Sequence, residues 1–215
     1  MQPITYINAD HAFRHAYGVI MSQGDQIQNT MAIHGASFSI DSPMDNIITS
    51  RKWSEDYAKA EWLWYLSENR SVKEISKLAK IWGFIADDDG NVNSNYGYQW
   101  SRTRQLNRVL KTLSRNPDSR RASISIYDGK ETHLYAKDTP CTYALGFNIV
   151  KGYLIMYVSM RSCDLVYGFC NDQYCFSQLH ALVANALQLE IGVCNWSIQS
   201  LHVYEKHYNL KIISK

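Results

Sequence analysis

The feature that most constrains the fold is a pair of apolar stretches separated by a short break. Residues 143–149 and 153–162 alternate or run apolar and are rich in β-branched and aromatic side chains, a pattern typical of strands. Val-Lys-Gly at 150–152 lies between them and is typical of a tight turn. The sequence therefore predicts an antiparallel hairpin here, and further strands at 121–129 and 197–208.

Three other segments have apolar residues at helical spacing. Residues 54–68 follow a serine cap, and residues 98–119 place leucine and valine side chains on one face before an Asn-Pro stop. Residues 176–192 predict a third, strongly apolar helix that Gly192 is expected to end. Together these segments predict an α+β fold with a mixed or antiparallel sheet and helices packed on one of its faces.

Composition excludes several classes of protein. The 215 residues are 46% hydrophobic and no repeat or linker divides them, so we expect one domain over residues 1–215. The formal net charge of +2 gives no strong field, and neither nucleic acid nor membrane is an expected partner. No signal peptide or membrane-spanning run is found, so a cytoplasmic location is expected. The 5 cysteines contain no CxxC pair and read as free thiols, and no metal-ligand spacing is present.

Arginines stand beside a helix stop and at a strand end. Arg120 and Arg121 are adjacent, and Arg161 has a hydroxyl neighbour in Ser162. Three guanidinium groups could together bind one phosphate group. The alternative is that these are ordinary surface arginines.

Other residue types indicate proton transfer and nucleophilic chemistry. Cys141 follows a proline at the mouth of an apolar strand, where nearby arginines are expected to lower its pKa, although packing is the commoner role. Glu61 lies in a Trp-rich apolar helix, where burial is expected to raise its pKa unless it sits on the helix rim. His202 and Tyr204 share one face of a strand and could bind a sugar hydroxyl.

These motifs occur in a characteristic order. The sequence contains "AEWLWYL", "IWGFIADDDGNVNSNYGYQW", "NPDSRR", "TPCT", "MRSCDLVYGF" followed by "ND", and "SLHVYEKHY". From about Gly35 to Tyr208 the chain resembles the thymidylate synthase and pyrimidine nucleotide hydroxymethylase superfamily. The resemblance implies the fold of that superfamily and a homodimer that forms through the sheet.

The resemblance also implies roles for individual residues. Cys141 matches the thiolate that adds to C6 of a pyrimidine nucleotide, so that C5 can attack the methylene group of 5,10-methylenetetrahydrofolate. Glu61 matches the acid that orders water and moves protons around the base. Tyr96 and Trp82 match aromatic walls of the site, Trp82 and Asp164 being on the folate side.

Phosphate and sugar ligands follow from the same resemblance. Arg161 and Ser162 match the phosphate-binding pair, whereas Arg120 and Arg121 match arginines that enter the partner subunit's site. In the motif "SLHVYEKHY", His202 and Tyr204 match the residues that bind the sugar 3′-hydroxyl. Deoxyribose and ribose both have this hydroxyl, so the match does not distinguish them. The expected partners are therefore a pyrimidine nucleoside monophosphate, a folate and a second copy of the chain.

One position predicts the base. Thymidylate synthases carry asparagine eleven residues after the arginine of "RSCD", and this chain has Asp172 there. A carboxyl that shares a proton with N3 and accepts from N4 fits cytosine, whereas uracil is expected to meet a mismatch. The combination resembles phage-type deoxycytidylate hydroxymethylases. The alternative is that Asp172 only caps a helix beginning near Phe176.

The chain departs from the synthases in several places. Thr142 stands where they have histidine, and no arginine or lysine lies between His15 and Ser50 to match their early phosphate arginine. The sequence ends about seven residues past Tyr208, so we expect a less sealed site in which water, rather than hydride, adds to the methylene on C5. We expect the three thiols that closely follow Arg161 to be packing residues: Cys163, Cys170 and Cys175.

The predicted reaction is hydroxymethylation of dCMP, and three alternatives remain open. A dCMP methyltransferase would use the same residues and yield 5-methyl-dCMP and dihydrofolate. A CMP-specific or dUMP-specific relative would differ only in the nucleotide. A non-catalytic nucleotide-binding or RNA-binding relative would keep the arginines without turnover.

Overall fold

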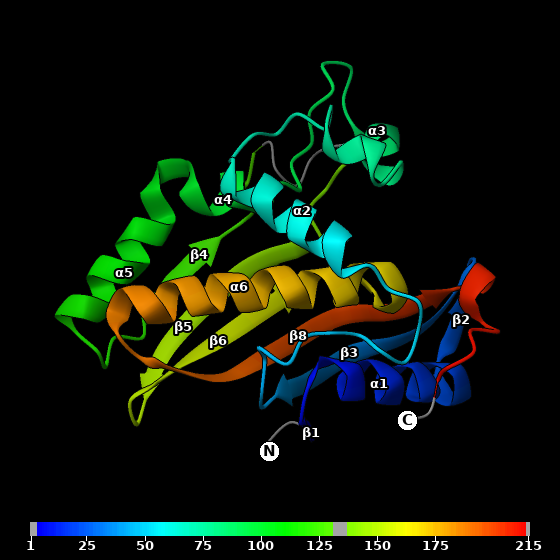
Figure 1. The fold of residues 1–215 in the computed structure, drawn as a ribbon, viewed down its shortest axis with the longest axis horizontal. Helices are drawn as coiled ribbons and strands as arrows, with labels where there is room; N and C mark the ends of the chain where they lie inside the picture. The colour runs from blue at the N-terminus through cyan, green and yellow to red at the C-terminus, as the bar shows by residue number, and fades with distance from the viewer. Residues whose placement is uncertain (1–3, 131–136, 214–215) are drawn as a thin grey trace.

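The computed structural model describes residues 4–130 and 137–213, and its centre is an 8-stranded sheet with the strand order β1-β3-β8-β6-β5-β4, in which β2 also pairs with β3 and β7 with β8 (Figure 1). The strands are β1 Ile4–Tyr6, β2 Asp25–Ile27, β3 Thr30–Ile40, β4 Ser123–Ser125, β5 Thr142–Val150, β6 Tyr153–Met160, β7 Cys163–Asp164 and β8 Glu190–Tyr204. The helices are α1 Ala9–Gln23, α2 Glu55–Leu66, α3 Ile81–Ile85, α4 Tyr96–Ser101, α5 Gln105–Arg115 and α6 Cys170–Leu187. Four single turns complete the set: η1 Ile75–Lys77, η2 Arg102–Arg104, η3 Leu165–Phe169 and η4 Glu205–His207.

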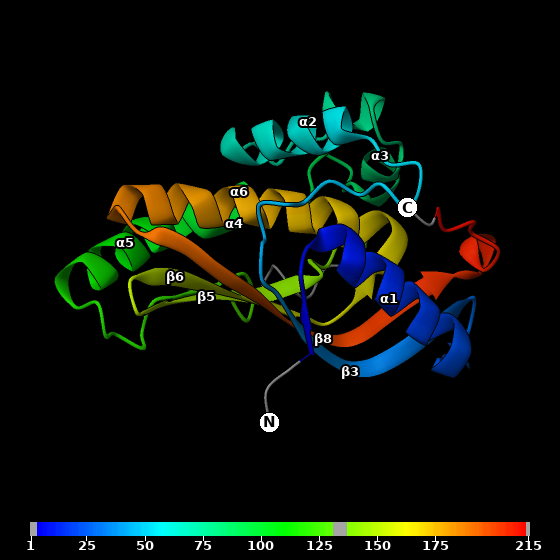
Figure 2. The ribbon, with the colours of Figure 1, turned by 60° about the horizontal axis from the view of Figure 1, so that its bottom comes forward.

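The sheet is mixed, and α1 and α6 pack on the same face of it (Figure 2). β5 and β6 are antiparallel, as are β3 and β8, but β6 and β8 are parallel. Along β6, Leu154, Met156 and Val158 are buried toward the helices, whereas Tyr153 and Tyr157 on the opposite face are exposed. The predicted α+β architecture is confirmed, and strand alternation explains which face the helices cover.

The hairpin of β5 and β6 forms as predicted. Lys151 and Gly152 at its turn both have positive φ, 52° and 85°, the conformation that matches the twist of two-residue hairpins. The neighbouring β4 is shorter than expected: it covers residues 123–125 of the predicted 121–129.

The predicted helix over 98–119 is wrong, because the segment breaks into α4 and α5. Thr103 and Arg104 have φ of 54° and 60°, which no continuous helix allows. The break is held from β4: Gln105 exchanges two 2.9 Å hydrogen bonds with the backbone of Ser125. The prediction for 54–68 is confirmed as α2, with the Ser54 hydroxyl accepting from the backbone N–H of Tyr57.

The last predicted helix is displaced. α6 begins at Cys170 rather than Phe176, and it ends where Gln188 turns into the left-handed region. Gly192 belongs to β8, where a Cβ would lie 2.9 Å from the backbone carbonyl oxygen of Leu154 in β6, so the close approach of the two strands favours glycine. The final strand is accordingly 190–204 instead of 197–208.

An aromatic cluster fixes α6 on the sheet. Trp196 of β8 packs against Phe38, Phe169 and Phe176, with ring centroids 5.2 to 6.2 Å apart. Its indole N–H donates to Gln173 of α6 over 3.0 Å. This contact fixes the first turn of α6, which carries Asp172. Over the described ranges, no helix has the length and apolar content needed to cross a membrane.

Candidate functional site

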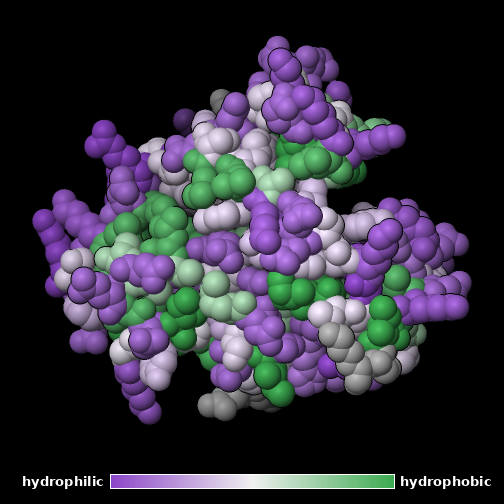
Figure 3. Space-filling model, in the orientation of Figure 1, coloured by the Kyte–Doolittle hydropathy of each residue, from purple (hydrophilic) through white to green (hydrophobic). Residues whose placement is uncertain are grey.

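Most of the predicted site residues converge beneath α3, from α2, α4, β5, β8 and the first turn of α6. Electrostatic interactions join Cys141, Asp164 and Asp172 to one another, and Asp172 interacts with Glu61. Figure 3 shows a notch in the molecular surface between α3 and the body of the protein, on the side where α6 begins. Elements far apart in the sequence therefore form one site.

Arg161 holds the segment that ends in Cys141. Its guanidinium donates to the carbonyl oxygens of Thr139 (2.6 Å) and Pro140 (3.2 Å), and its backbone N–H donates to the carbonyl of Cys141 (2.9 Å). The Tyr127 hydroxyl also donates to the Pro140 carbonyl, over 2.8 Å. The thiol is thus attached to a fixed piece of backbone at the start of β5.

Two further contacts fix the nucleophile segment from the side of α4. The hydroxyl of Tyr96, which is buried, accepts from the backbone N–H of Thr142 over 3.0 Å. The carboxylate of Asp138 accepts from the backbone N–H groups of Asn93 (2.6 Å) and Ser94 (2.8 Å), and from the Ser94 hydroxyl (2.6 Å). Sequence analysis missed Asp138; its signal was an acid just before the motif that contains the cysteine.

The expectation of a depressed pKa at Cys141 is wrong. Burial raises the pKa of this thiol to about 11, and the carboxyl groups of Asp172, Asp138 and Asp164 raise it further, while Arg161 alone lowers it. Two of the three arginines of the sequence argument, Arg120 and Arg121, lie elsewhere, so burial together with the acidic groups outweighs Arg161. In the free subunit Cys141 is a neutral thiol.

Asp172 is a carboxyl without internal partners. It lies in the first turn of α6, partly exposed, and makes no hydrogen bond to the residues that the structure describes. Burial raises its pKa well above the usual range, and the charges of Glu61 and Asp164 add to the effect. It does not cap α6, so the capping alternative is wrong. The carboxyl is open to the site, and its surroundings favour the protonated form.

Glu61 is held tightly from one side. The side chain is 4% exposed, and Oε1 accepts from the Tyr65 hydroxyl over 2.7 Å, whereas Oε2 is buried without a partner among the described residues. Burial raises the pKa of Glu61, as expected, and the hydroxyls of Tyr65 and Tyr57 partly offset this. Tyrosines at four-residue spacing on either side of Glu61 were a readable signal that sequence analysis did not use.

Trp82 is positioned by α2. Its indole N–H donates to the Tyr57 hydroxyl over 2.8 Å, and its ring meets Trp64 edge-on at 4.9 Å. Next to it, α3 and the residues before it expose apolar side chains at Leu78, Ile81 and Phe84. Apolar surface is visible around α3 beside the notch (Figure 3). A flat, apolar ligand would find a partly formed surface here.

The end of β8 supplies His202 and Tyr204. Their rings lie 5.1 Å apart and edge-on, and His202 is paired in the sheet with Asp164. Tyr204 reaches the same cluster, because burial, Asp164 and Cys141 raise its pKa and Arg161 lowers it. Ser162 lies between β6 and β7, half-buried beside Arg161.

Arg120 and Arg121 do not lie in the site of their own subunit. Both are exposed, and the backbone around them pairs with Phe147 and Asn148 of β5. Asn148 lies seven residues along the strand from Cys141, which is roughly 20 Å at the rise of an extended chain. Arg161 is therefore the one predicted phosphate-binding arginine that the described chain places beside the thiol.

The other thiols are buried in the core. Cys163, Cys170, Cys175 and Cys194 are free and fully covered, and burial raises the pKa of each. Their surroundings are those of packing residues. Across residues 4–130 and 137–213, no group of three or more His, Cys, Asp or Glu side chains is arranged to hold a metal ion.

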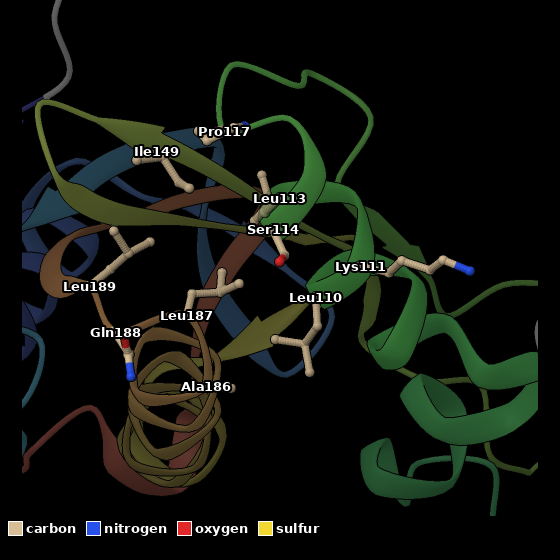
Figure 4. Close-up of a pocket in the computed structure, with 10 residues that line it drawn as sticks. All are labelled: Leu110, Lys111, Leu113, Ser114, Pro117, Ile149, Ala186, Leu187, Gln188 and Leu189. Carbon is tan, nitrogen blue, oxygen red and sulfur yellow. The ribbon is translucent and has the colours of Figure 1, made fainter.

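A separate hollow lies at the far end of the molecule. α5, the end of β5 and the end of α6 surround it, and its lining combines apolar residues such as Leu110 and Leu187 with polar ones such as Lys111 and Gln188 (Figure 4). None of the predicted site residues lines it. We therefore do not assign the reaction to this hollow.

Comparison with known proteins identifies the family. The family model described as thymidylate synthase matches residues 14–213, so the chain belongs to the thymidylate synthase family. Its members carry out folate-dependent one-carbon transfer to C5 of a pyrimidine nucleotide. The fold agrees: thermostable thymidylate synthase A from Bacillus subtilis superposes with a TM-score of 0.79 at 21% identity, over 95% of this chain and 85% of that one.

Curated relatives include two kinds of enzyme. The chain is 32% identical over 185 residues to the thymidylate synthase of Fusobacterium nucleatum subsp. nucleatum, covering 81% of this chain and 66% of that protein. It is 35% identical over 198 residues to the deoxycytidylate 5-hydroxymethyltransferase of Enterobacteria phage T4, covering 84% of this chain and 78% of that protein. The family thus includes members that differ in nucleotide and in product.

Proposed function

We propose that the protein is a deoxycytidylate 5-hydroxymethyltransferase, which converts dCMP, 5,10-methylenetetrahydrofolate and water into 5-hydroxymethyl-dCMP and tetrahydrofolate. The observation that carries the proposal is Asp172, a carboxyl whose pKa is raised well above the usual range by burial and which makes no hydrogen bond to the residues that the structure describes. The similarity to the phage hydroxymethyltransferase supports it. We further propose that residues 1–215 form one catalytic domain. The family match over residues 14–213 supports this.

Cytosine has the hydrogen-bonding groups that a neutral Asp172 needs. The acid proton would be donated to N3, and the carbonyl oxygen would accept from the N4 amino group. When a thiolate adds to C6, electrons move through C5 and C4 onto N3. A proton donor at N3 stabilises that charge as it develops, which is the form of stabilisation that accelerates a reaction.

Uracil would use the same carboxyl less well. Its N3 is a donor, and the charge from C6 addition collects on O4 rather than on N3. An ionised Asp172 would repel that oxygen, whereas an amide at this position could donate to O4 and accept from N3–H. Asp172 therefore favours cytosine, and asparagine would favour uracil.

Cys141 would be the nucleophile and Glu61 the proton-transfer group. The thiol loses its proton as sulfur bonds to C6, and Arg161 favours the thiolate. Glu61 has one unpartnered carboxylate oxygen, Oε2, that could hold a water and receive the hydrogen leaving C5. When bound, the folate supplies the one-carbon unit; Trp82 and Asp164 would hold it beside the apolar surface of α3.

The nucleotide's phosphate would need arginines from two chains. Arg161 and Ser162 come from one subunit, and we propose that Arg120 and Arg121 of the partner subunit complete the site. Their distance along β5 from Cys141 in the same chain supports this arrangement. The open face of the sheet, with Tyr153, Ile155 and Tyr157, offers the surface for a homodimer. His202 and Tyr204 would bind the sugar 3′-hydroxyl.

Mass spectrometry of the product tests the proposal. The enzyme is incubated separately with dCMP, CMP and dUMP in the presence of methylenetetrahydrofolate. We expect 5-hydroxymethyl-dCMP from dCMP, with tetrahydrofolate released. A 5-methyl product with one equivalent of dihydrofolate would show a methyltransferase, product from CMP or dUMP alone would overturn the nucleotide assignment, and no product at all would indicate a binding protein.

A further inference from the structure

Three side chains of α2 form a row. Tyr57, Glu61 and Tyr65 are spaced by four residues, so they lie on the same face of the helix. The Tyr65 hydroxyl donates to Oε1 of Glu61 over 2.7 Å. On the other side the Tyr57 hydroxyl, which also interacts with the carboxyl, accepts from the indole N–H of Trp82 over 2.8 Å.

The tyrosine rings cannot easily move away. Tyr65 is 1% exposed, and its ring packs edge-on against Tyr96 and Trp100 at 5.5 and 6.0 Å. The backbone beneath it is also fixed, because a Cβ at Gly97 would overlap the Tyr65 carbonyl group. The hydroxyl that bonds Oε1 is therefore held by packing from α4, and Oε2 stays without a partner in the described part of the chain.

We propose that Tyr57 and Tyr65 are positioning residues for Glu61, which hold its carboxyl between two hydroxyl groups and leave Oε2 for the substrate side of the site. The inference deepens the proposed function, because it rests on Glu61 moving protons during C5 chemistry. It assigns the two tyrosines a task in the reaction rather than in packing alone.

The surroundings of Glu61 explain why two hydroxyls are needed. From α2 itself Tyr57 and Tyr65 face it, from α6 Asp172 and Cys175, and from α3 the indole of Trp82 touches Tyr57. Burial raises the pKa of Glu61, and neither of the two α6 groups can carry a positive charge that would lower it. The described groups that favour the ionised form are the two tyrosine hydroxyls.

The direction of the effect on pH dependence follows. A hydrogen bond to a carboxylate stabilises the ionised form, so its removal raises the pKa of that carboxyl. Glu61 must be ionised to accept a proton, and the low-pH limb of the rate profile should report its ionisation. Loss of either hydroxyl therefore moves that limb to higher pH, by about one pH unit for the direct bond from Tyr65.

The test uses Tyr65→Phe and Tyr57→Phe in the full chain. Release of hydrogen from C5-tritiated dCMP, with folate present, is followed from pH 5 to 9, with Tyr174→Phe as the matched control. The Tyr174 ring is also buried, and it packs against Trp53 with the ring centroids 6.1 Å apart. At pH 6 we expect kcat to fall about tenfold in Tyr65→Phe and less in Tyr57→Phe, with KM for dCMP unchanged and wild-type rates near pH 9.

Several results would overturn the inference. A rate that falls equally at every pH, or a limb that stays in place in both variants, would mean that the hydroxyls serve only packing. If Tyr174→Phe moved the low-pH limb by as much as Tyr65→Phe does, the effect would likewise come from a loss of packing rather than from the hydroxyl groups. Tyr57 is less buried than Tyr65, so its replacement disturbs the core less. If Tyr65→Phe does not fold, the shift of the low-pH limb is measured in Tyr57→Phe alone. Wild-type release from dUMP but not from dCMP would count against the proposed function instead, and the tyrosine comparison would then be made with dUMP.

Discussion

The two walls of the candidate site each contribute a carboxyl group with a raised pKa, but the groups are held in opposite ways. Glu61 on α2 is bonded through Oε1 to Tyr65 and lies 4% exposed. Asp172 on α6 is more open to the site and has no hydrogen bond to described residues. Burial is the largest cause of the raised pKa in both.

This difference separates two tasks. A carboxyl with internal partners keeps its position and protonation state whether or not substrate is present. A carboxyl without them costs free energy in the empty site and regains it when a ligand supplies the partners. We therefore propose that the α2 wall serves proton transfer and the α6 wall serves recognition, with Cys141 between them.

Cys141→Ala should have the largest effect, because neither wall can act without a nucleophile. We expect loss of turnover and of hydrogen exchange at C5, while dCMP still binds through Asp172 and the arginines. Calorimetric titration with dCMP and tritium release measure the two properties. Cys194→Ala, which changes a thiol buried in β8, is the control; retained exchange in Cys141→Ala would rule out this residue as the nucleophile.

Asp172→Asn should alter recognition alone. An amide cannot give N3 of cytosine the proton that the acid gives, but it can donate to O4 of uracil and accept from N3–H. We expect the ratio of kcat/KM for dCMP to that for dUMP to fall by about 100-fold, since a buried polar mismatch costs a few kcal/mol. Asp118→Asn on the surface is the control. An unchanged ratio would remove the reason for assigning cytosine.

Mixing two inactive chains should restore part of the activity. One chain carries Cys141→Ala, and the other carries Arg120→Ala and Arg121→Ala. Random exchange of subunits gives hybrid dimers in which one site has all its parts, so we expect about a quarter of wild-type activity. Recovery is measured after mild denaturation and refolding together. If labelled subunits exchange and no activity returns, each site is built from one chain.

Ser54→Ala should have the smallest effect and should act on the α2 wall only. The Ser54 hydroxyl caps α2 by accepting from the backbone N–H of Tyr57. Its loss should lower the free energy of unfolding by about 1 kcal/mol, measured by denaturant titration, with the dCMP to dUMP ratio unchanged. Ser114→Ala, exposed on α5, is the control and should not destabilise the protein. A changed ratio would show that the two walls are not independent.

The parts of the fold that were predicted correctly depend on local physics. The alternation of β6, the positive-φ turn at Lys151 and Gly152, and the cap at Ser54 each act within a few residues. The errors depend on distant contacts. The break at Thr103 is held by β4, and Gly192 lies in a strand whose neighbour, β6, comes too close at Leu154 for a Cβ. A single sequence does not display such partners.

The candidate site also has features that the sequence predicted and features that depend on distant contacts. The order of the motifs pointed to Cys141, Glu61, Asp172 and Arg161, and the structure brings these four together. It leaves Arg120 and Arg121 outside the site of their own chain, and it adds Asp138, which no motif marked. The pKa of Cys141 was predicted in the wrong direction, because the direction of its shift depends first on how deeply the thiol is buried and then on which charges surround it in space.

By itself the sequence determined which chemical groups this protein has available, a thiol, two acids and a set of arginines, and the hairpin that carries the thiol at its start. These follow from residue identity and from spacing along the chain. Only the tertiary structure decided that one acid is bonded and the other open, and that the thiol rests in its neutral form. Protonation and hydrogen bonding are set by burial and by neighbours within a few ångströms, and folding alone brings those neighbours together.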